Sequence, residues 1–473
     1  MTAFFPGSDE ILRNIPWEVV VRVGAGLLRE LAKVLRRPKA KVQLSNFEQG
    51  LLAMREARFG RAVELFELSF TEGMPVRARA ALYNVIGVCF ERMSEYPEAE
   101  GYFNRTLDSA HEAHDAEIAA AALANLGLVY TGRGDFARAE KYCRQALEIY
   151  EGIDDPASQA AVLDNLGATY YNRGDPDRAE QHFRRALQLH RASQNAFGQA
   201  ATLGNLGNVY ADRGCLERAD EHYKQALEIH TRINNPLGVA EALGNLGVVQ
   251  QARGNLDLAE DHYRRVLEVL EHAPNPLAEA TALLNLGNVY LGRSQLGQAL
   301  ECYERALAIE GQVGNVRGQA DCLGSLGIVY AAQGDLDTAQ KLHTRALEMQ
   351  TSVQNRDGEA QQLASLGNLY IRRGDLERAE EEHTRALEMR RAAGNALGEA
   401  NQLGSLGLLA YHRGRSDEAR QLLSQAVALF DRVGAGGGNA QIVRAALRRL
   451  EEAGEEKPQR RTRKRKDQEP PAG

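Results

Sequence analysis

The chain has 473 residues, of which 44% are apolar and only 6% aromatic, and its formal net charge is −7. Single compact cores stop growing at about 250–300 residues, so this length predicts several domains or a repeat array. Five widely spaced cysteines without a CxxC pair argue against a disulfide framework or a zinc site and favour a reducing compartment. Residues 1–41 carry +4 and residues 457–473 carry +5, so the body carries −16, which argues against nucleic-acid binding along it.

The first 43 residues precede the repeats and predict a separate amphipathic helical segment. Within residues 8–37, apolar side chains share one helical face, namely Val20, Val23, Leu27, Leu31 and Val34. This face either packs on the first repeat as a cap or binds a membrane surface or a partner helix. Residues 1–9 lack a secretory signal pattern, and five charged residues within 17–35 exclude an ordinary membrane span. We therefore expect a soluble, cytoplasmic protein.

A 40-residue repeat runs without gaps from about residue 77 to residue 436. A Leu-Gly pair, first seen as Leu126-Gly127, recurs in eight copies, and an alanine such as Ala139 follows the glycine twelve residues later. In each copy the apolar residues before and after the turn follow helical spacing, as in Leu123, Leu126 and Tyr130. A fixed period of 20–50 residues indicates a solenoid or a propeller, and the helical spacing selects the solenoid.

Small residues mark the turn and the helix contact within each copy. Gly134 follows the first helix and recurs in seven of the eight regular copies, with Ser294 as the exception. Glycine fits this position because the residue after a helix often adopts a left-handed conformation. Gly127 and Ala139 are expected to face each other, so that the two helices approach closely. The fold class predicted is all-α, a right-handed α-solenoid of antiparallel helix pairs.

The repeat pattern Leu-x-x-Leu-Gly-x-x-Tyr, then Gly, then Ala-x-x-x-Tyr-x-x-Ala-Leu, resembles the tetratricopeptide family over residues 44–436. The 40-residue period is longer than the usual 34 and is similar to the long-repeat branch that includes kinesin light chain and the Leu-Gly-Asn-rich polarity adaptors. The segment Leu203-Gly204-Asn205-Leu206-Gly207-Asn208 matches the adaptor repeat letter for letter. The G-protein-binding motifs of those adaptors are not carried over, because only about 37 residues follow the array.

The array is expected to hold about ten units over residues 44–436, with two irregular units followed by eight regular copies from 117 to 436. Residues 437–453 predict a more polar capping helix. Residues 454–473 predict a disordered basic tail, with the run Arg460-Arg461-Thr462-Arg463-Lys464-Arg465-Lys466. That run is either a solubilising end, a nuclear-import signal, or a contact for nucleic acid or an anionic membrane.

Asparagines recur at two places in the first helix of the repeats. The first set precedes the repeated leucine, and the second lies one turn further on; together they are Asn125, Asn165, Asn205, Asn245, Asn285, Asn208, Asn288 and Asn368. Serine replaces the first set at Ser325, Ser365 and Ser405. In the resembled family the first helices line a concave groove, where carboxamides can both donate to and accept from a peptide backbone. The alternative is that these asparagines bond neighbouring helices and only specify stacking.

Arginines and histidines also recur in register. Arginines precede the turn at Arg133, Arg173, Arg213, Arg253, Arg293, Arg373 and Arg413. They either stabilise helix ends and pair with acidic residues of other repeats, or recognise acidic side chains of a peptide. His182, His222 and His262 lie a whole repeat apart, so they cannot share one metal ion and are expected at the surface.

No catalytic constellation is evident: the sequence has no Walker loop, no HExxH and no GxSxG. We predict a non-enzymatic scaffold or adaptor that binds a partner's peptide or helix in the concave groove, without cofactor, metal or small-molecule substrate. The alternative is a sensor array that changes superhelical shape on binding a peptide or ligand and thereby controls a separate protein.

Overall fold

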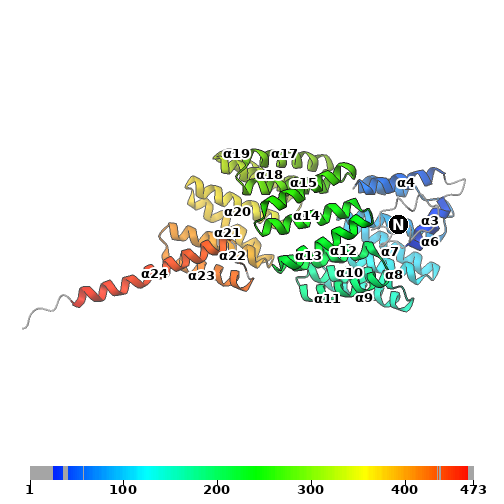
Figure 1. The fold of residues 1–473 in the computed structure, drawn as a ribbon, viewed down its shortest axis with the longest axis horizontal. Helices are drawn as coiled ribbons and strands as arrows, with labels where there is room; N and C mark the ends of the chain where they lie inside the picture. Colours follow the sequence, from blue (N-terminus) through cyan, green and yellow to red (C-terminus); the bar gives the residue numbers. More distant parts are fainter. Residues whose placement is uncertain (1–24, 36–40, 57, 434, 436–437, 467–473) are drawn as a thin grey trace, which may run out of the picture. The chain divides into compact units, whose positions relative to one another are not determined.

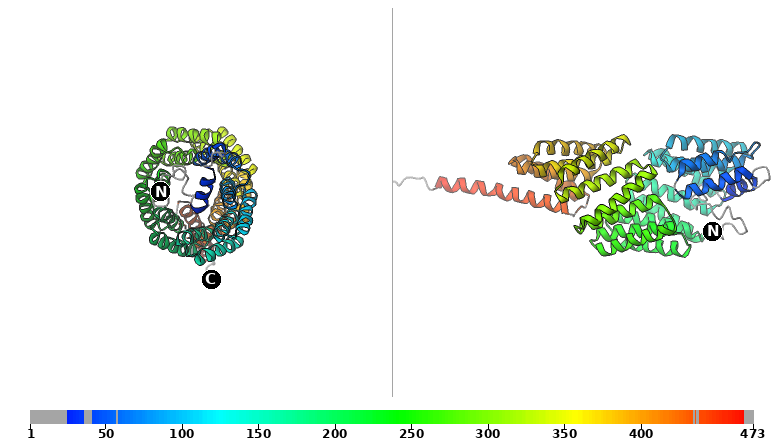
Figure 2. Two further views of the ribbon diagram at one scale, coloured as in Figure 1. Left: turned by 90° about the vertical axis from the view of Figure 1, so that its right-hand side faces the viewer. Right: turned by 90° about the horizontal axis from the view of Figure 1, so that it is seen from above.

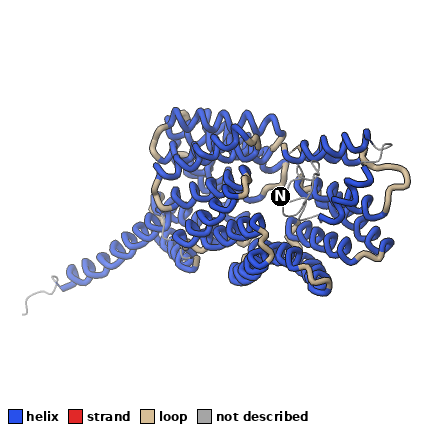
Figure 3. Tube along the Cα trace, turned by 45° about the vertical axis from the view of Figure 1, so that its right-hand side comes forward, coloured by secondary structure: helices blue, strands red, loops and turns tan. Residues whose placement is uncertain are grey.

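The computed structural model describes residues 25–35, 41–56, 58–433, 435 and 438–466, and every regular element among them is a helix (Figure 3). The all-α solenoid predicted from the repeat is thereby confirmed. The chain divides into two compact units, Met1–Val289 (unit 1) and Tyr290–Gly473 (unit 2). None of the described helices is long and apolar enough to cross a membrane.

In the described part of unit 1, helix α3 comes first, and antiparallel helix pairs follow it (Figure 1). Its helices are α3 (Ala25–Leu35), α4 (Lys41–Arg55), α5 (Phe59–Glu67), α6 (Val76–Arg92), α7 (Tyr96–Ala113), α8 (Ala116–Gly132), α9 (Phe136–Gly152), α10 (Pro156–Asn172), α11 (Pro176–Ala192), α12 (Ala196–Asp212), α13 (Leu216–Arg232), α14 (Pro236–Ala252) and α15 (Leu256–His272). Helix α16 (Pro276–Gly292) ends just beyond the unit boundary. From α6 to α14, the first helix of each pair also contacts the first helix of the next, as α8 contacts α10.

Unit 2 continues the same pairing. Its helices are α17 (Leu296–Val313), α18 (Val316–Gln333), α19 (Leu336–Ser352), α20 (Arg356–Arg373), α21 (Leu376–Ala392), α22 (Ala396–His412), α23 (Ser416–Arg432) and α24 (Gly438–Lys466). Helix α24 packs on α22 and α23 through Ala440, Val443, Ala446 and Leu450, which are all buried.

The turns follow from a left-handed residue and a capping side chain. Gly134 has a φ of 75°, as predicted, and Ser294, which replaces glycine in another copy, has a φ of 60°. The carboxylate of Asp135 then accepts a hydrogen bond of 3.1 Å from the backbone N–H of Arg138 and caps the second helix. Such caps stabilise a helix by about 1 kcal/mol, and they recur at Asp175, Asp335 and Asp375. At the same position, Cys215, Asn255, Gln295 and Arg415 make no capping hydrogen bond.

The repeated glycine in the first helix is required by a close contact, as predicted. A Cβ atom at Gly247 would lie 2.5 Å from Cε1 of Tyr263, and a Cβ at Gly167 would lie 2.5 Å from Cε1 of Phe183. The principal neighbour is therefore a side chain sixteen residues later. The repeated alanine contributes less: the carbonyl oxygen of Ala139 would lie 3.4 Å from a Cβ at Gly127.

The two ends of the chain differ in part from the expectation. Helix α3 packs on α6 and α4, with Leu31 and Val34 buried, while Val20 and Val23 lie outside the described residues. Helix α24 continues to Lys466, whereas the capping helix was expected to end at 453 and a disordered tail to follow. Residues 451–466 are rich in Glu, Arg and Lys, whose high helix propensity allows the helix to continue beyond the described apolar contacts, which end at Leu450. Residues 467–473 lie outside the described part.

Candidate peptide-binding surface

The predicted asparagines occupy equivalent positions on the first helices of their pairs. Asn125, Asn165, Asn205, Asn245 and Asn285 lie on α8, α10, α12, α14 and α16. Because successive first helices contact one another from α8 to α14, these positions recur along one layer of helices in unit 1. Asn368 lies on α20 in unit 2, so the eight candidates do not all belong to one unit.

Asn125 must be removed from the candidate surface. Its side chain is only 1% exposed, and its Nδ2 donates a hydrogen bond of 2.7 Å to Oδ1 of Asn84 on α6. A carboxamide buried in this way has a structural role, because leaving either partner unsatisfied would cost about 1–3 kcal/mol. For this residue the stacking alternative is correct.

The next four members of the first set differ from Asn125. Asn165, Asn205, Asn245 and Asn285 are half-buried, and within the described part of the chain their side chains have no hydrogen-bond partner. We call these four residues the asparagine surface. Each carboxamide can donate two hydrogen bonds and accept two, so a ligand that approaches the first helices meets unused polar groups held in register.

The second set has more varied surroundings. The carboxamide oxygen of Asn208 accepts a hydrogen bond of 2.6 Å from Oη of Tyr223, which fixes its orientation and leaves its amide hydrogens available. Asn288 and Asn368 are exposed on α16 and α20. The serines that replace the first set in unit 2 are also half-buried, and Ser325 donates 3.0 Å to the carbonyl oxygen of Asp321 in its own helix.

The recurring arginines pair with acidic residues of the preceding repeat, which confirms one of the two predicted roles. Distances from guanidinium nitrogen to carboxylate oxygen are 2.6 Å for Arg133–Glu100, 2.6 Å for Arg213–Glu180 and 2.9 Å for Arg253–Glu217. In unit 2, Arg373 pairs with Asp337 and Arg413 with Glu380. Partly exposed ion pairs of this kind stabilise by about 0–1 kcal/mol each.

The three recurring histidines stand apart from one another, as predicted, but are half-buried. The ring of His182 stacks on Tyr170 with centroids 5.2 Å apart and an interplanar angle of 4°. Burial lowers the pKa of both His182 and His262. Over the described residues, no group of three or more His, Cys, Asp or Glu side chains could hold a metal ion.

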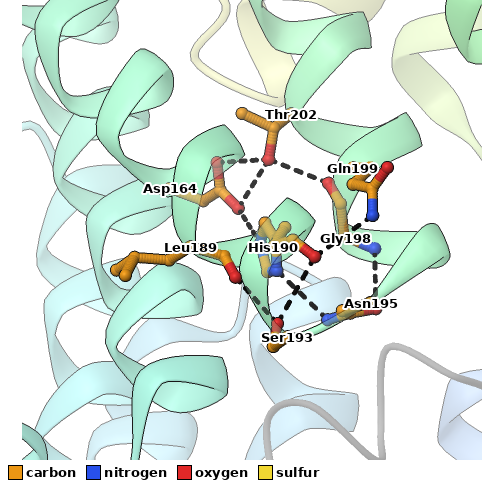
Figure 4. A network of polar contacts seen from close by, with 8 residues as sticks. All are labelled: Asp164, Leu189, His190, Ser193, Asn195, Gly198, Gln199 and Thr202. Carbon is orange, nitrogen blue, oxygen red and sulfur yellow. Dashed lines mark hydrogen bonds and ion pairs between the residues drawn. The ribbon is translucent and has the colours of Figure 1, made fainter.

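A buried polar network was missed at the sequence level (Figure 4). His190 on α11 lies 3.0 Å through Nε2 from Oδ2 of Asp164 on α10, and its Nδ1 lies 3.1 Å from Nδ2 of Asn195. The hydroxyl of Thr202 lies 2.9 Å from Oδ1 of Asp164, and burial raises the pKa of that carboxyl group. The network joins two consecutive pairs, so it specifies how they stack.

The signal for this network is the residue that changes at a fixed place in the repeat. At 40-residue intervals the position of His190 is occupied by Tyr150, His230, Leu270, Glu310, Gln350, Arg390 and Phe430, all of them buried. A position that is buried everywhere but changes its chemistry between most copies, with histidine alone occurring twice, distinguishes most junctions from one another. Searching the repeat for variable positions as well as constant ones would have found it.

Family models agree with the geometry. Tetratricopeptide repeat models match residues 77–152, 117–192 and 359–432, and a MalT-like TPR region model matches residues 166–357. The chain belongs to the tetratricopeptide repeat family. The narrower resemblance to kinesin light chain and the polarity adaptors stays a prediction. No curated protein matches this tetratricopeptide chain by sequence.

Solved structures share the tetratricopeptide fold at low sequence identity. The apo quorum sensor NprR from B. thuringiensis is 13% identical, with a TM-score of 0.55 over 75% of this chain and 98% of its own. A Rap protein complexed with competence and sporulation factor is 14% identical, with a TM-score of 0.52 over 75% of this chain and 99% of its own. A signal-transduction ATPase with a tetratricopeptide repeat sensor from Pyrococcus horikoshii is 16% identical, with a TM-score of 0.50 over 70% of this chain and 52% of its own.

Proposed function

We propose that this tetratricopeptide protein is a non-enzymatic scaffold that holds an extended peptide segment of a partner protein along the asparagine surface. The observation that carries the proposal is the set of half-buried carboxamides at Asn165, Asn205, Asn245 and Asn285, which have no partner among the described residues. Four polar side chains kept in register without an internal partner are better explained by a ligand than by stacking.

The spacing of the carboxamides suits the backbone of a peptide. Packed helices lie about 8–10 Å apart, and an extended chain advances about 3.3 Å per residue, so each repeat spans about three peptide residues. A carboxamide at every third residue can bond backbone N–H and C=O groups whatever the side chains are. The oriented carboxamide of Asn208 adds one further donor on α12. Binding of this kind is tolerant of sequence and selects mainly for an extended segment.

The test uses peptides selected from a random displayed library on the wild-type protein. We expect Asn205, Asn245 and Asn285 changed together to Ala to weaken the selected peptides at least tenfold, because three neutral hydrogen bonds contribute about 0.5–1.5 kcal/mol each. The matched control changes Ser325, Ser365 and Ser405 to Ala and should weaken binding less, since a hydroxyl has one donor and a shorter reach. Circular dichroism must show that both triples stay folded. Equal losses for the two triples, or unfolding of the asparagine triple, would contradict the proposal.

A sensor function is the second candidate, and it is supported by the similarity to a quorum sensor and to a tetratricopeptide repeat sensor. In that case the selected peptide would change the dimensions of the array and so control a separate protein. Small-angle scattering with and without the peptide separates the two functions. A scaffold keeps its radius of gyration when it binds, whereas a sensor changes it.

We place this activity in the cytoplasm. All five cysteines are free, and only Cys215 is exposed, which suits a reducing compartment. Labelling of the chain in its own cells would test the location.

A further inference from the structure

The first helices of unit 1 present the same face in successive pairs, but this face is covered only at the start of the array. On α10 the face comprises Ala161, Asn165 and Ala168, which are all half-buried. On α6 the equivalent residues Ala81, Val85 and Val88 have exposed fractions of only 0%, 0% and 2%. Forty residues later, on α8, Ala121 is 5% and Asn125 1% exposed. The face is therefore covered on α6, is only partly covered on α8, where the third residue Leu128 is half-buried, and is open from α10 onward.

The cover over α6 is the chain's own helix α3. Helix α3 contacts α6, and Figure 2 (left) shows it on the inner side of the helices of unit 1. Its leucines at 28, 31 and 35 are each 0% exposed, and this i, i+3, i+7 spacing forms one apolar stripe. A helix that lays such a stripe on a groove of other helices is a common mode of peptide recognition.

We propose that the face of α6 is a binding site for an amphipathic helix, that α3 occupies this site in cis, and that a partner helix with leucines at i, i+3 and i+7 displaces α3. A short connection joins α3 to α4, so its effective concentration is in the millimolar range. A partner helix must therefore bind more tightly than α3 does, or α3 must be weakened first. The proposal adds to the binding of extended peptides and does not require it, because the asparagine surface lies on α10 to α16.

The experiment uses the full chain and, as probe, a labelled synthetic peptide of residues 20–37. In the variant Leu28→Asp/Leu31→Asp, α3 loses its stripe, so we expect the probe to bind at least tenfold more tightly than it binds to the wild type. Adding Val88→Asp on α6 should abolish this gain. The Asn205, Asn245 and Asn285 to Ala changes should leave it intact, which separates this site from the asparagine surface. Equal affinity of wild type and variant for the probe would overturn the proposal, and so would loss of the variant's helical circular dichroism.

Hydrogen exchange on the wild-type chain gives a second and independent test. If α3 leaves its site while the rest of unit 1 stays folded, its amides become accessible to solvent without global unfolding. We therefore expect the amides of α3 to exchange at least tenfold faster than those of α6. Equal protection of the two helices would show that α3 opens only when unit 1 unfolds. That result would make α3 a permanent part of the core and would overturn the proposal.

Discussion

Unit 1 and unit 2 repeat the same helix pair but differ in the residues of the asparagine surface and in those packed against the repeated glycines. In unit 1, Asn205 and Asn245 are half-buried on the first helices, while Tyr223 and Tyr263 fill the space under the repeated glycines. In unit 2 the positions equivalent to the asparagine surface are serines. There the interior holds two buried pairs, in which Nδ1 of His343 lies 2.9 Å from Oε1 of Gln362 and Nδ1 of His383 lies 2.9 Å from Oε1 of Gln402.

The difference shows which residues fix the repeat and which are free to vary. Both units keep the glycine, the alanine twelve residues later and the left-handed residue at the turn, because these set the distance between the helices and where the first helix ends. The residue packed against the glycine changes from tyrosine to histidine without a change of fold. The chemistry offered to a ligand can therefore differ between units that share one backbone pattern.

The largest loss of stability is expected at Gly247, where the close contact with Tyr263 leaves no room for a side chain. Gly247→Leu would force a side chain into the ring of Tyr263, and overpacking of this kind typically costs about 1–3 kcal/mol. Because repeats stabilise their neighbours, the loss should spread over several repeats of unit 1. Thermal unfolding followed by circular dichroism measures it.

The matched control is Gly244→Leu on the same helix. A Cβ at Gly244 would meet nothing within 4 Å, and the chain itself carries Leu284 at the equivalent position of the next repeat. We expect this variant to be as stable as the wild type or slightly more so, because glycine inside a helix costs about 0.5–1 kcal/mol. Equal destabilisation by both leucine variants would show that the contact with Tyr263 is not the cause of the stability lost in Gly247→Leu.

A smaller effect, dependent on pH, is expected from the histidine pairs of unit 2. Burial lowers the pKa of His343 and of His383, so the folded state favours the neutral imidazoles. Below the histidine pKa of about 6.5 in the unfolded chain, the unfolded chain binds protons that the folded chain does not bind. The contribution of these two histidines to stability therefore falls as the pH falls. Burial raises the pKa of Glu310 and Asp321, and these carboxyl groups act in the opposite direction.

Replacing a histidine pair of unit 2 with the residues at the equivalent positions of unit 1 isolates the effect of the histidine on the pH dependence of stability. His343→Tyr with Gln362→Ala copies Tyr223 and Ala242, and both proteins keep Glu310 and Asp321, whose effects then cancel. We expect the double variant to lose less stability than the wild type between pH 7.5 and pH 5 in denaturant titrations. His343→Tyr alone leaves the Gln362 side chain without its partner and should cost about 1–3 kcal/mol. If the free energy of unfolding depends on pH identically in the wild type and the double variant, His343 does not contribute to the pH dependence.

Much of the fold could be predicted because it is decided locally. Gly134 fixes a turn through its left-handed conformation, and the 40-residue register places a left-handed residue at that turn in every regular copy. The candidate site could be predicted only in part. Asn125 and Asn165 have identical sequence positions in the repeat, yet Asn125 is buried because Asn84, forty-one residues earlier, bonds it. That contact depends on how neighbouring helices pack, which the repeat pattern alone does not reveal.

The smallest change in stability is expected from deleting the basic C-terminal residues of unit 2. The described apolar contacts of α24 end at Leu450, so deleting residues 457–473 should change the free energy of unfolding by no more than about 0.5 kcal/mol. The segment carries seven Lys or Arg residues against two acidic ones, so any binding to nucleic acid or anionic vesicles should weaken steeply with salt and disappear in the truncated chain. A second truncation that removes residues 438–473 strips Val443 and Leu450 from α22 and α23 and should lower the melting temperature. If the shorter deletion destabilises unit 2 as much as the longer one, residues 457–466 of α24 contribute to its fold, and the basic run is structural.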